Sequence, residues 1–122
     1  MNKLSLINDE DKKIITFKIN NEIKQNLKKT LITSKNYNLK KKTDWVNEAI
    51  QMLKEIPDYT DLVLHADGSG RDFVFDKIYM SFKQRCFFAD MRSEVVRAHP
   101  DIQGPQAAII RAAILNRLMR NL

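Results

Sequence analysis

The sequence predicts a mainly α-helical fold with a short two-stranded antiparallel ribbon, made of two strand–helix–helix units in tandem that form a pseudo-dimer in one chain. Three observations support this prediction. Apolar residues alternate at two places far apart in the chain, apolar residues at helical spacing follow each of them, and the two patterns can be superimposed. We expect an N-terminal arm over 1–13, a first unit over 14–56, a linker or small hairpin over 57–76, and a second unit over 77–122.

The first unit opens with a predicted strand, because apolar residues occupy every second position from 15 to 19. Its inward face would carry Ile15, Phe17 and Ile19, and its outward face Ile14, Thr16 and Lys18. Asn20-Asn21 can cap a helix that ends near Ser34. Apolar residues four positions apart give this helix one buried face: Ile23, Leu27 and Leu31.

A second helix should follow the turn Asn36-Tyr37-Asn38, capped by Thr43-Asp44 and stopped by Pro57. Its apolar stripe comprises Trp45, Ala49, Met52, Leu53 and Ile56. Between the units, Leu62–Leu64 and Phe73–Phe75 flank the stretch Asp67-Gly68-Ser69-Gly70. These residues predict either a small hairpin or a linker.

The second unit repeats this order. Its strand would face inward with Ile78, Met80 and Phe82 and outward with Lys77, Tyr79, Ser81 and Lys83. Two helices follow, one closed by Pro100 and one that starts at Gly104-Pro105. The apolar stripe of the first consists of Phe87, Met91, Val95 and Ala98. The last helix is apolar nearly all round, as expected of a helix buried between partners.

The two units superimpose with one adjustment. The strands match at an offset of 63 residues, which places Ile15 on Ile78, and the helices match at 64, which places Ala49 on Ala113. One extra residue within 83–85 would reconcile the two offsets without turning either strand over. A strand with two helices cannot satisfy its own backbone, so the two strands should pair as an antiparallel ribbon.

The net charge of +6 and a pI of about 9.5 suit a partner that carries phosphates, although solubility alone could explain them. Residues 1–56 hold twelve lysines against seven acids, whereas the remaining residues have a net charge of only +1. A phosphate grip should therefore be stronger in the first half.

Nothing in the sequence predicts an enzyme, a cofactor or a metal site. His65, His99 and Cys86 lack the spacing of zinc ligands, and residues 67–70 lack the Lys-Ser/Thr of a phosphate loop. The carboxylates are scattered. The apolar stretch near residue 4 is too short for a signal peptide, and no segment reaches the length of a membrane span. With a single cysteine besides, the sequence predicts a cytoplasmic protein with no membrane partner.

Residues 15–23 (ITFKINNEI) and 43–50 (TDWVNEAI) resemble the ribbon–helix–helix superfamily of MetJ and Arc. The resemblance implies a protein that binds double-stranded DNA by inserting its ribbon in the major groove. The implied base-contacting residues are Ile14, Thr16, Lys18, Tyr79, Ser81 and Lys83. The implied phosphate-contacting residues, at the N-termini of the second helices, are Lys40, Lys41, Lys42, Thr43 and Gln106. Pro105 lacks an amide, so the second clamp should be weaker.

Residues 49–59 are similar to the end of a repeat in the TraY-type accessory proteins of conjugative DNA transfer, which carry two such units in one chain. This likeness implies binding near a plasmid transfer origin, as part of a relaxosome, with a relaxase or another transfer protein as a candidate partner. Transcription regulation is the other role open to such a protein. The alternatives are an antitoxin or adaptor that binds proteins, and a winged-helix DNA-binding regulator with its wing at 62–75.

Overall fold

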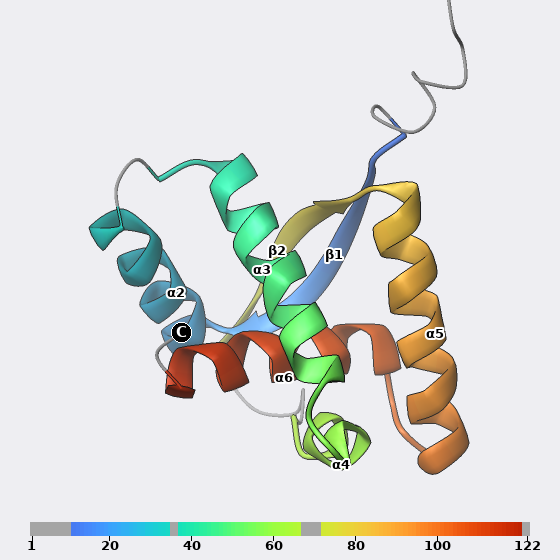
Figure 1. Cartoon of the computed structure of the whole chain (residues 1–122). Coiled ribbons are helices and arrows are strands. Elements are labelled where there is room, and N and C mark those ends of the chain that lie inside the picture. Colours follow the sequence, from blue (N-terminus) through green and yellow to red (C-terminus); the bar gives the residue numbers. More distant parts are fainter. Residues whose placement is uncertain (1–10, 35–36, 67–71, 121–122) are drawn as a thin grey trace, which may run out of the picture.

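The computed structural model describes residues 11–34, 37–66 and 72–120. As predicted, the fold is mainly helical with one two-stranded antiparallel sheet (Figure 1). No helix in these described ranges is long and apolar enough to cross a membrane. The elements in chain order are β1 (Lys13–Asn20), α2 (Asn21–Thr33), α3 (Leu39–Lys54), α4 (Tyr59–Leu64), β2 (Phe73–Met80), α5 (Phe82–Ala98) and α6 (Pro105–Arg120).

β1 follows the predicted alternation. Phe17 and Ile19 are buried and Ile15 is half-buried, whereas Ile14, Thr16 and Lys18 are exposed. The strand ends where Asn20 caps α2, because the Asn20 side chain accepts hydrogen bonds from the backbone amides of Glu22 and Ile23. The end of β1 and the start of α2 therefore lie where the sequence predicts them.

β2 lies earlier in the chain than predicted. The strand spans Phe73–Met80, and Ser81 caps α5 through a capping box with Gln84. Phe82 is therefore not an inward strand residue but the first residue of α5, and its side chain is 53% exposed. Ile78 and Met80 nevertheless face the core as predicted. Alternate residues of a strand point to the same face wherever the strand begins and ends, so the earlier position of β2 does not change their direction.

The segment 57–76 forms no hairpin within its described residues. Leu62–Leu64 belong to α4, and Phe73–Phe75 pair with β1 instead of with Leu62–Leu64. The predicted turn at 67–70 lies outside the described residues, and so does most of the N-terminal arm 1–13. The described part of 62–75 therefore does not form the wing that a winged-helix protein would need.

α4 is held against α5 by a buried tyrosine. The Tyr59 hydroxyl donates a hydrogen bond to the Glu94 carboxylate, which also forms an ion pair with Lys54. Burial, together with the Glu94 carboxylate, raises the pKa of Tyr59, so that its hydroxyl stays protonated. The hydrogen bond from Tyr59 lowers the pKa of Glu94.

α3 begins four residues before the predicted cap. Its N-cap is Asn38, whose side chain accepts a hydrogen bond from the Lys41 amide, so helix α3 starts at Leu39. Thr43 is an interior helix residue and is buried. The three lysines at 40–42 therefore lie in the first turn of the helix, not in a loop before it.

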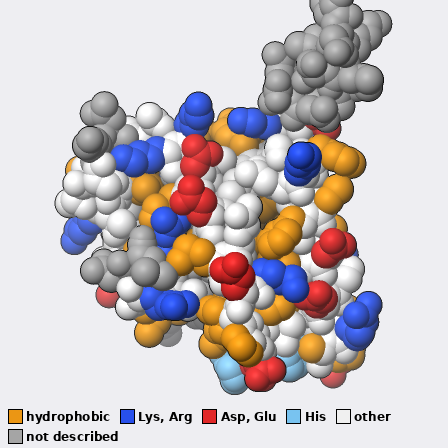
Figure 2. All heavy atoms as spheres, viewed as in Figure 1, with side chains coloured by type: hydrophobic (Ala, Val, Ile, Leu, Met, Phe, Trp, Pro, Cys, Tyr) orange, Lys and Arg blue, Asp and Glu red, His pale blue; other side chains and the backbone are white. Residues whose placement is uncertain are grey.

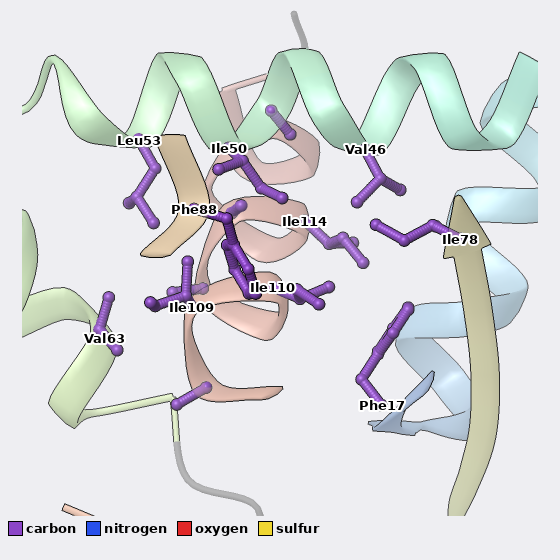
Figure 3. Close-up of a cluster of buried hydrophobic side chains, with 14 of the residues drawn as sticks. Phe17, Val46, Ile50, Leu53, Val63, Ile78, Phe88, Ile109, Ile110 and Ile114 are labelled. Carbon is purple, nitrogen blue, oxygen red and sulfur yellow. The ribbon is translucent and has the colours of Figure 1, made fainter. Parts of the chain in front are cut away.

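The ribbon lies behind α3 in the view of Figure 1, with α6 crossing below it and α2 and α5 on either side. Side chains from both strands and from α3, α4, α5 and α6 meet in one core, in which Phe17 and Ile78 point toward the α3–α6 interface (Figure 3). α6 is buried on every side from Ala108 to Ile114, as its nearly continuous apolar sequence predicts.

The second helix after each strand packs on the other strand, so that α3 contacts β2 and α6 contacts β1. One buried polar side chain on each helix makes a matching contact. Asn47 Nδ2 donates to the carbonyl of Tyr79 at 3.0 Å, and Arg111 donates to the carbonyl of Lys18 at 3.1 Å. α3 and α6 also pack directly on each other.

Candidate nucleic-acid interface

The outward face of the ribbon is a solvent-facing surface formed by both strands. Cross-strand partners share a face, and three such pairs form the middle of this surface: Ile14 with Tyr79, Thr16 with Lys77, and Lys18 with Phe75. Five of these six side chains are exposed and Tyr79 is half-buried. Along the described length of both strands the outward side chains include two lysines and no carboxylate. The surface therefore offers hydrogen-bond donors and apolar groups to a partner.

Four of the six predicted base-contacting residues lie on this face: Ile14, Thr16, Lys18 and Tyr79. The predicted placement of Ser81 and Lys83 on the strand is wrong, because β2 ends at Met80. The Ser81 side chain is occupied as the cap of α5, where it accepts a hydrogen bond from the Gln84 amide. Lys83 is exposed in the first turn of α5 and lines a groove between α3 and α5. Neither side chain projects from the ribbon.

Phe75 and Lys77 lie on the outward face, but neither is among the predicted base-contacting residues. The alternating pattern does extend back to Phe73, but Asp76 occupies an inward position and interrupts its apolar face. That carboxylate is buried because Lys42 of α3 pairs with it, Nζ to Oδ1 at 2.6 Å. One local signal was available, since Ser81 and Gln84 have the spacing of a capping box and mark the start of a helix at Phe82.

A notch of about 300 Å³ separates the ribbon from the N-terminus of α3. Among the predicted phosphate-contacting residues, Lys40 is exposed at this notch and Thr43 lines its floor. The Thr43 hydroxyl lies 3.3 Å from the Tyr79 amide and accepts its hydrogen bond. The notch is lined by Lys12, Leu39, Lys40, Thr43, Asp44 and Tyr79.

The other two predicted lysines of this turn already have partners within the protein. Lys41 donates to the Ser34 carbonyl at 3.0 Å and is half-buried, whereas Lys42 is buried in its pair with Asp76. Lys42 therefore points into the protein, and its ammonium group is not available to a phosphate in this conformation. Lys40 and Lys41 remain at the surface of the turn.

A second notch, of about 660 Å³, separates the ribbon from the N-terminus of α6. Gly104 precedes the helix at φ +54°, a conformation that favours glycine, and Pro105 follows it. Gln106, the predicted phosphate contact of the second unit, is exposed in the first turn. The charged residues that line this notch are Lys18, Asp101 and Arg111.

Each notch is lined by two cationic side chains and one carboxylate, but both cations are exposed at α3, whereas at α6 Lys18 is exposed and Arg111 is buried. The notch at α3 combines Lys12 and Lys40 with one carboxylate, Asp44. At α6, the guanidinium group of Arg111 is buried and bonds the carbonyls of Lys18 and Ala66, and Asp101 is exposed. On the helical side of the molecule, acidic and basic side chains are interspersed among hydrophobic ones (Figure 2).

Within the described ranges, no group of three or more His, Cys, Asp or Glu side chains could hold a metal ion. Comparisons of the chain with protein-family models, with curated proteins and with solved structures found no match. A function must therefore be inferred from the residues of the ribbon face and of the two helix N-termini.

Proposed function

We propose that this protein binds double-stranded DNA by inserting the β1–β2 ribbon into the major groove, and that its two strand–helix–helix units act as a pseudo-dimer within one chain. The observation that carries the proposal is the exposed ribbon face, which along its described length has two lysines and no carboxylate and is flanked by two helix N-termini. The ribbon–helix–helix resemblance of residues 15–23 and 43–50 points the same way.

Matching contacts in the two halves support the pseudo-dimer. Asn20 and Ser81, the caps that end the strands, are 61 residues apart. The same offset relates Lys18 to Tyr79, whose carbonyls accept from Arg111 and Asn47. These two donors are 64 residues apart, as predicted for the helices. These caps and carbonyls favour a strand offset of 61, whereas the apolar pattern predicted 63. With the offset of 61, the additional residues of the second unit lie after Ser81, where α5 has 17 residues against 13 in α2.

The 61-residue offset maps Thr16 onto Lys77, and these two residues are also cross-strand partners. A pseudo-two-fold axis through this pair would relate β1 to β2, α2 to α5, and α3 to α6. It would also relate the two notches, because each lies between an outward strand residue and the start of a second helix. Such an arrangement would put the two proposed phosphate contacts at symmetry-related positions about the ribbon.

The dimensions and chemistry of the ribbon fit the major groove. The groove is wide enough for a two-stranded ribbon and presents a different donor and acceptor pattern for each base pair. Lys18 and Lys77 can donate to guanine acceptors, and Thr16 can donate or accept. The amides at the start of a helix favour a phosphate, and lysine side chains add charge at α3. These interactions would combine base recognition with a grip on the backbone.

The role that we favour is that of a relaxosome accessory protein in conjugative transfer, with transcription regulation as the second role open to the same DNA-binding surface. The tandem arrangement supports the first role through the likeness of residues 49–59 to TraY-type proteins. An antitoxin or adaptor role would need an exposed docking helix. The most apolar helix, α6, instead has its Ala108–Ile114 segment buried in the core.

The proposal can be tested by a salt-series binding titration with the full chain. The DNA would be duplexes selected from a random-sequence library, together with fragments flanking the protein's own gene. The test variant is Thr16→Ala/Lys77→Ala, the central pair of the ribbon. The matched control is Ser93→Ala/Arg92→Ala on the exposed side of α5, which removes one hydroxyl and one positive charge elsewhere.

We expect tight, salt-sensitive binding to one sequence, weakened at least tenfold by the ribbon variant and changed little by the control. A bidentate base contact contributes about 1–3 kcal/mol of discrimination, and this range corresponds to a loss of that size. Equal binding by the ribbon variant would place the contact elsewhere on the molecule. No binding to any duplex would favour the protein-interaction alternative.

A further inference from the structure

We propose that the ribbon recognises two thymines, one on each DNA strand, through contacts of Phe75 and Ile14 with the thymine 5-methyl groups. This inference depends on the proposed function and names part of the DNA sequence that the same surface would select. It gives the predicted base-contacting residue Ile14 an apolar contact and adds a second residue, Phe75, which the sequence analysis assigned to the segment between the units.

Both residues are large apolar side chains that are exposed on the outward face, whereas Phe73, at the end of the same face, is half-buried. Phe75 is 66% exposed and Ile14 is 52% exposed. Exposed apolar side chains are common when scattered singly, but these two occupy related positions. The 61-residue offset that relates Lys18 to Tyr79 also relates Ile14 to Phe75. Each end of the ribbon therefore carries one apolar side chain beside one polar side chain.

The neighbours of Phe75 position it for contact with a base. The Lys18 ammonium lies over its ring, 5.7 Å from the centroid, and the Lys24 ammonium lies 3.5 Å from its carbonyl oxygen. This contact keeps the Lys18 ammonium and the Phe75 ring together on the outward face of the ribbon. Lys18 would then be adjacent to Phe75 in the groove and could donate to a neighbouring purine.

Thymine is the base that matches an apolar side chain in the major groove, because its 5-methyl group is the one apolar group displayed there by the four standard bases. The residue opposite Ile14 is Tyr79, and Phe75 lies four residues before Tyr79 on β2. At ~3.4 Å per strand residue, the two side chains are separated by roughly 14 Å along the ribbon. The two thymines would therefore lie no more than about four base-pair steps apart.

The experiment removes the methyl groups and leaves every hydrogen bond in place. A duplex selected by the full chain is resynthesised with deoxyuridine in place of thymine, first at all positions and then at one position at a time. Binding is measured for the wild type and for Phe75→Ala, Phe75→Leu and Ile14→Ala. The matched control is Phe82→Ala, because Phe82 is 53% exposed but lies on α5 and not on the ribbon.

We expect the wild type to bind about fourfold more weakly for each critical methyl removed, the ratio that corresponds to one buried methyl group. Phe75→Ala should be insensitive to uridine at one of the two positions, Ile14→Ala at the other, and Phe75→Leu should keep part of the sensitivity. Phe82→Ala should behave as the wild type.

Two results would overturn the inference and leave the proposed function standing. The first is equal affinity of the wild type for the thymine and uridine duplexes. The second is a Phe75→Ala variant that binds more weakly but keeps full sensitivity to uridine, since Phe75 would then act on another part of the DNA. Failure to bind any duplex would instead overturn the proposed function as well.

Discussion

The buried ion pair between Lys42 and Asp76 is the residue-scale feature that most changes the expected site. It removes Lys42 from the phosphate-contacting set and places a carboxylate on the inward face of β2. Asp76 Oδ1 also accepts from the Lys77 amide at 2.8 Å, whereas Asp76 Oδ2 is buried without a hydrogen-bond partner in the described structure. The corresponding residue on β1, at the 61-residue offset, is Ile15.

We predict that Asp76→Ala lowers the free energy of unfolding by about 3–5 kcal/mol, because it leaves the Lys42 ammonium buried without its carboxylate. The double variant Lys42→Met/Asp76→Val should have a free energy of unfolding equal to or greater than that of the wild type, since no charge then remains buried. Urea unfolding followed by circular dichroism measures both. A decrease of less than about 1 kcal/mol for Asp76→Ala would mean that water reaches Lys42 and solvates it.

At the scale of the element, the N-termini of α3 and α6 both lie beside the ribbon, but their first turns carry different charges. α3 presents Lys40 and Lys41 in its first turn, and α6 presents Gln106 after Pro105. Helix N-termini attract phosphates through their amides, and each lysine that contacts a phosphate displaces a counterion. The two helices should therefore contribute unequally to DNA affinity.

We predict that Lys40→Gln/Lys41→Gln weakens binding to all duplexes by a similar factor and reduces the slope of log K against log salt by about 0.9 for each phosphate that the variant no longer neutralises. Gln106→Ala should change the slope little. The control for net charge is Arg92→Gln/Arg97→Gln, which removes two exposed positive charges from α5. A control variant that lowers the slope as much as the α3 variant would indicate a long-range charge effect instead of direct contact.

At the scale of the whole molecule, the two strands form one ribbon whose halves differ in sequence. The outward residues related by the 61-residue offset are Ile14 and Phe75, Thr16 and Lys77, and Lys18 and Tyr79. A homodimer of single units reads a palindrome because its two halves are identical. A pseudo-dimer with unequal halves should read an asymmetric sequence.

We therefore predict that DNA sites selected from a random library by the full chain are not palindromic, and that the stronger phosphate contacts lie on the α3 side. High-throughput sequencing of selected duplexes gives the first result, and ethylation interference of the phosphates gives the second. Recovery of perfect palindromes would contradict recognition of an asymmetric site and would point to two chains that place identical strands together.

Much of the fold could be predicted from sequence because its signals are local. The alternation of Ile15, Phe17 and Ile19 determines which face of β1 is buried, and Asn20 determines where α2 begins. The capping box at Ser81 marks the start of α5 in the same way. These features depend only on residues a few positions apart, so a short stretch of sequence is enough to predict them.

Long-range contacts decided the rest. β2 extends back to Phe73 because Lys42, 34 residues earlier in the chain than Asp76, compensates the charge of that carboxylate on the inward face. The same contact removes Lys42 from the predicted phosphate site, and the position of β2 adds Phe75 to the ribbon face and excludes Ser81 and Lys83 from it. The sequence by itself determined the two strands, the four long helices and the buried face of β1, but not the short helix α4. Only the tertiary structure decided where β2 begins, because a buried charge such as that of Asp76 is tolerated only where a partner from another element can reach it.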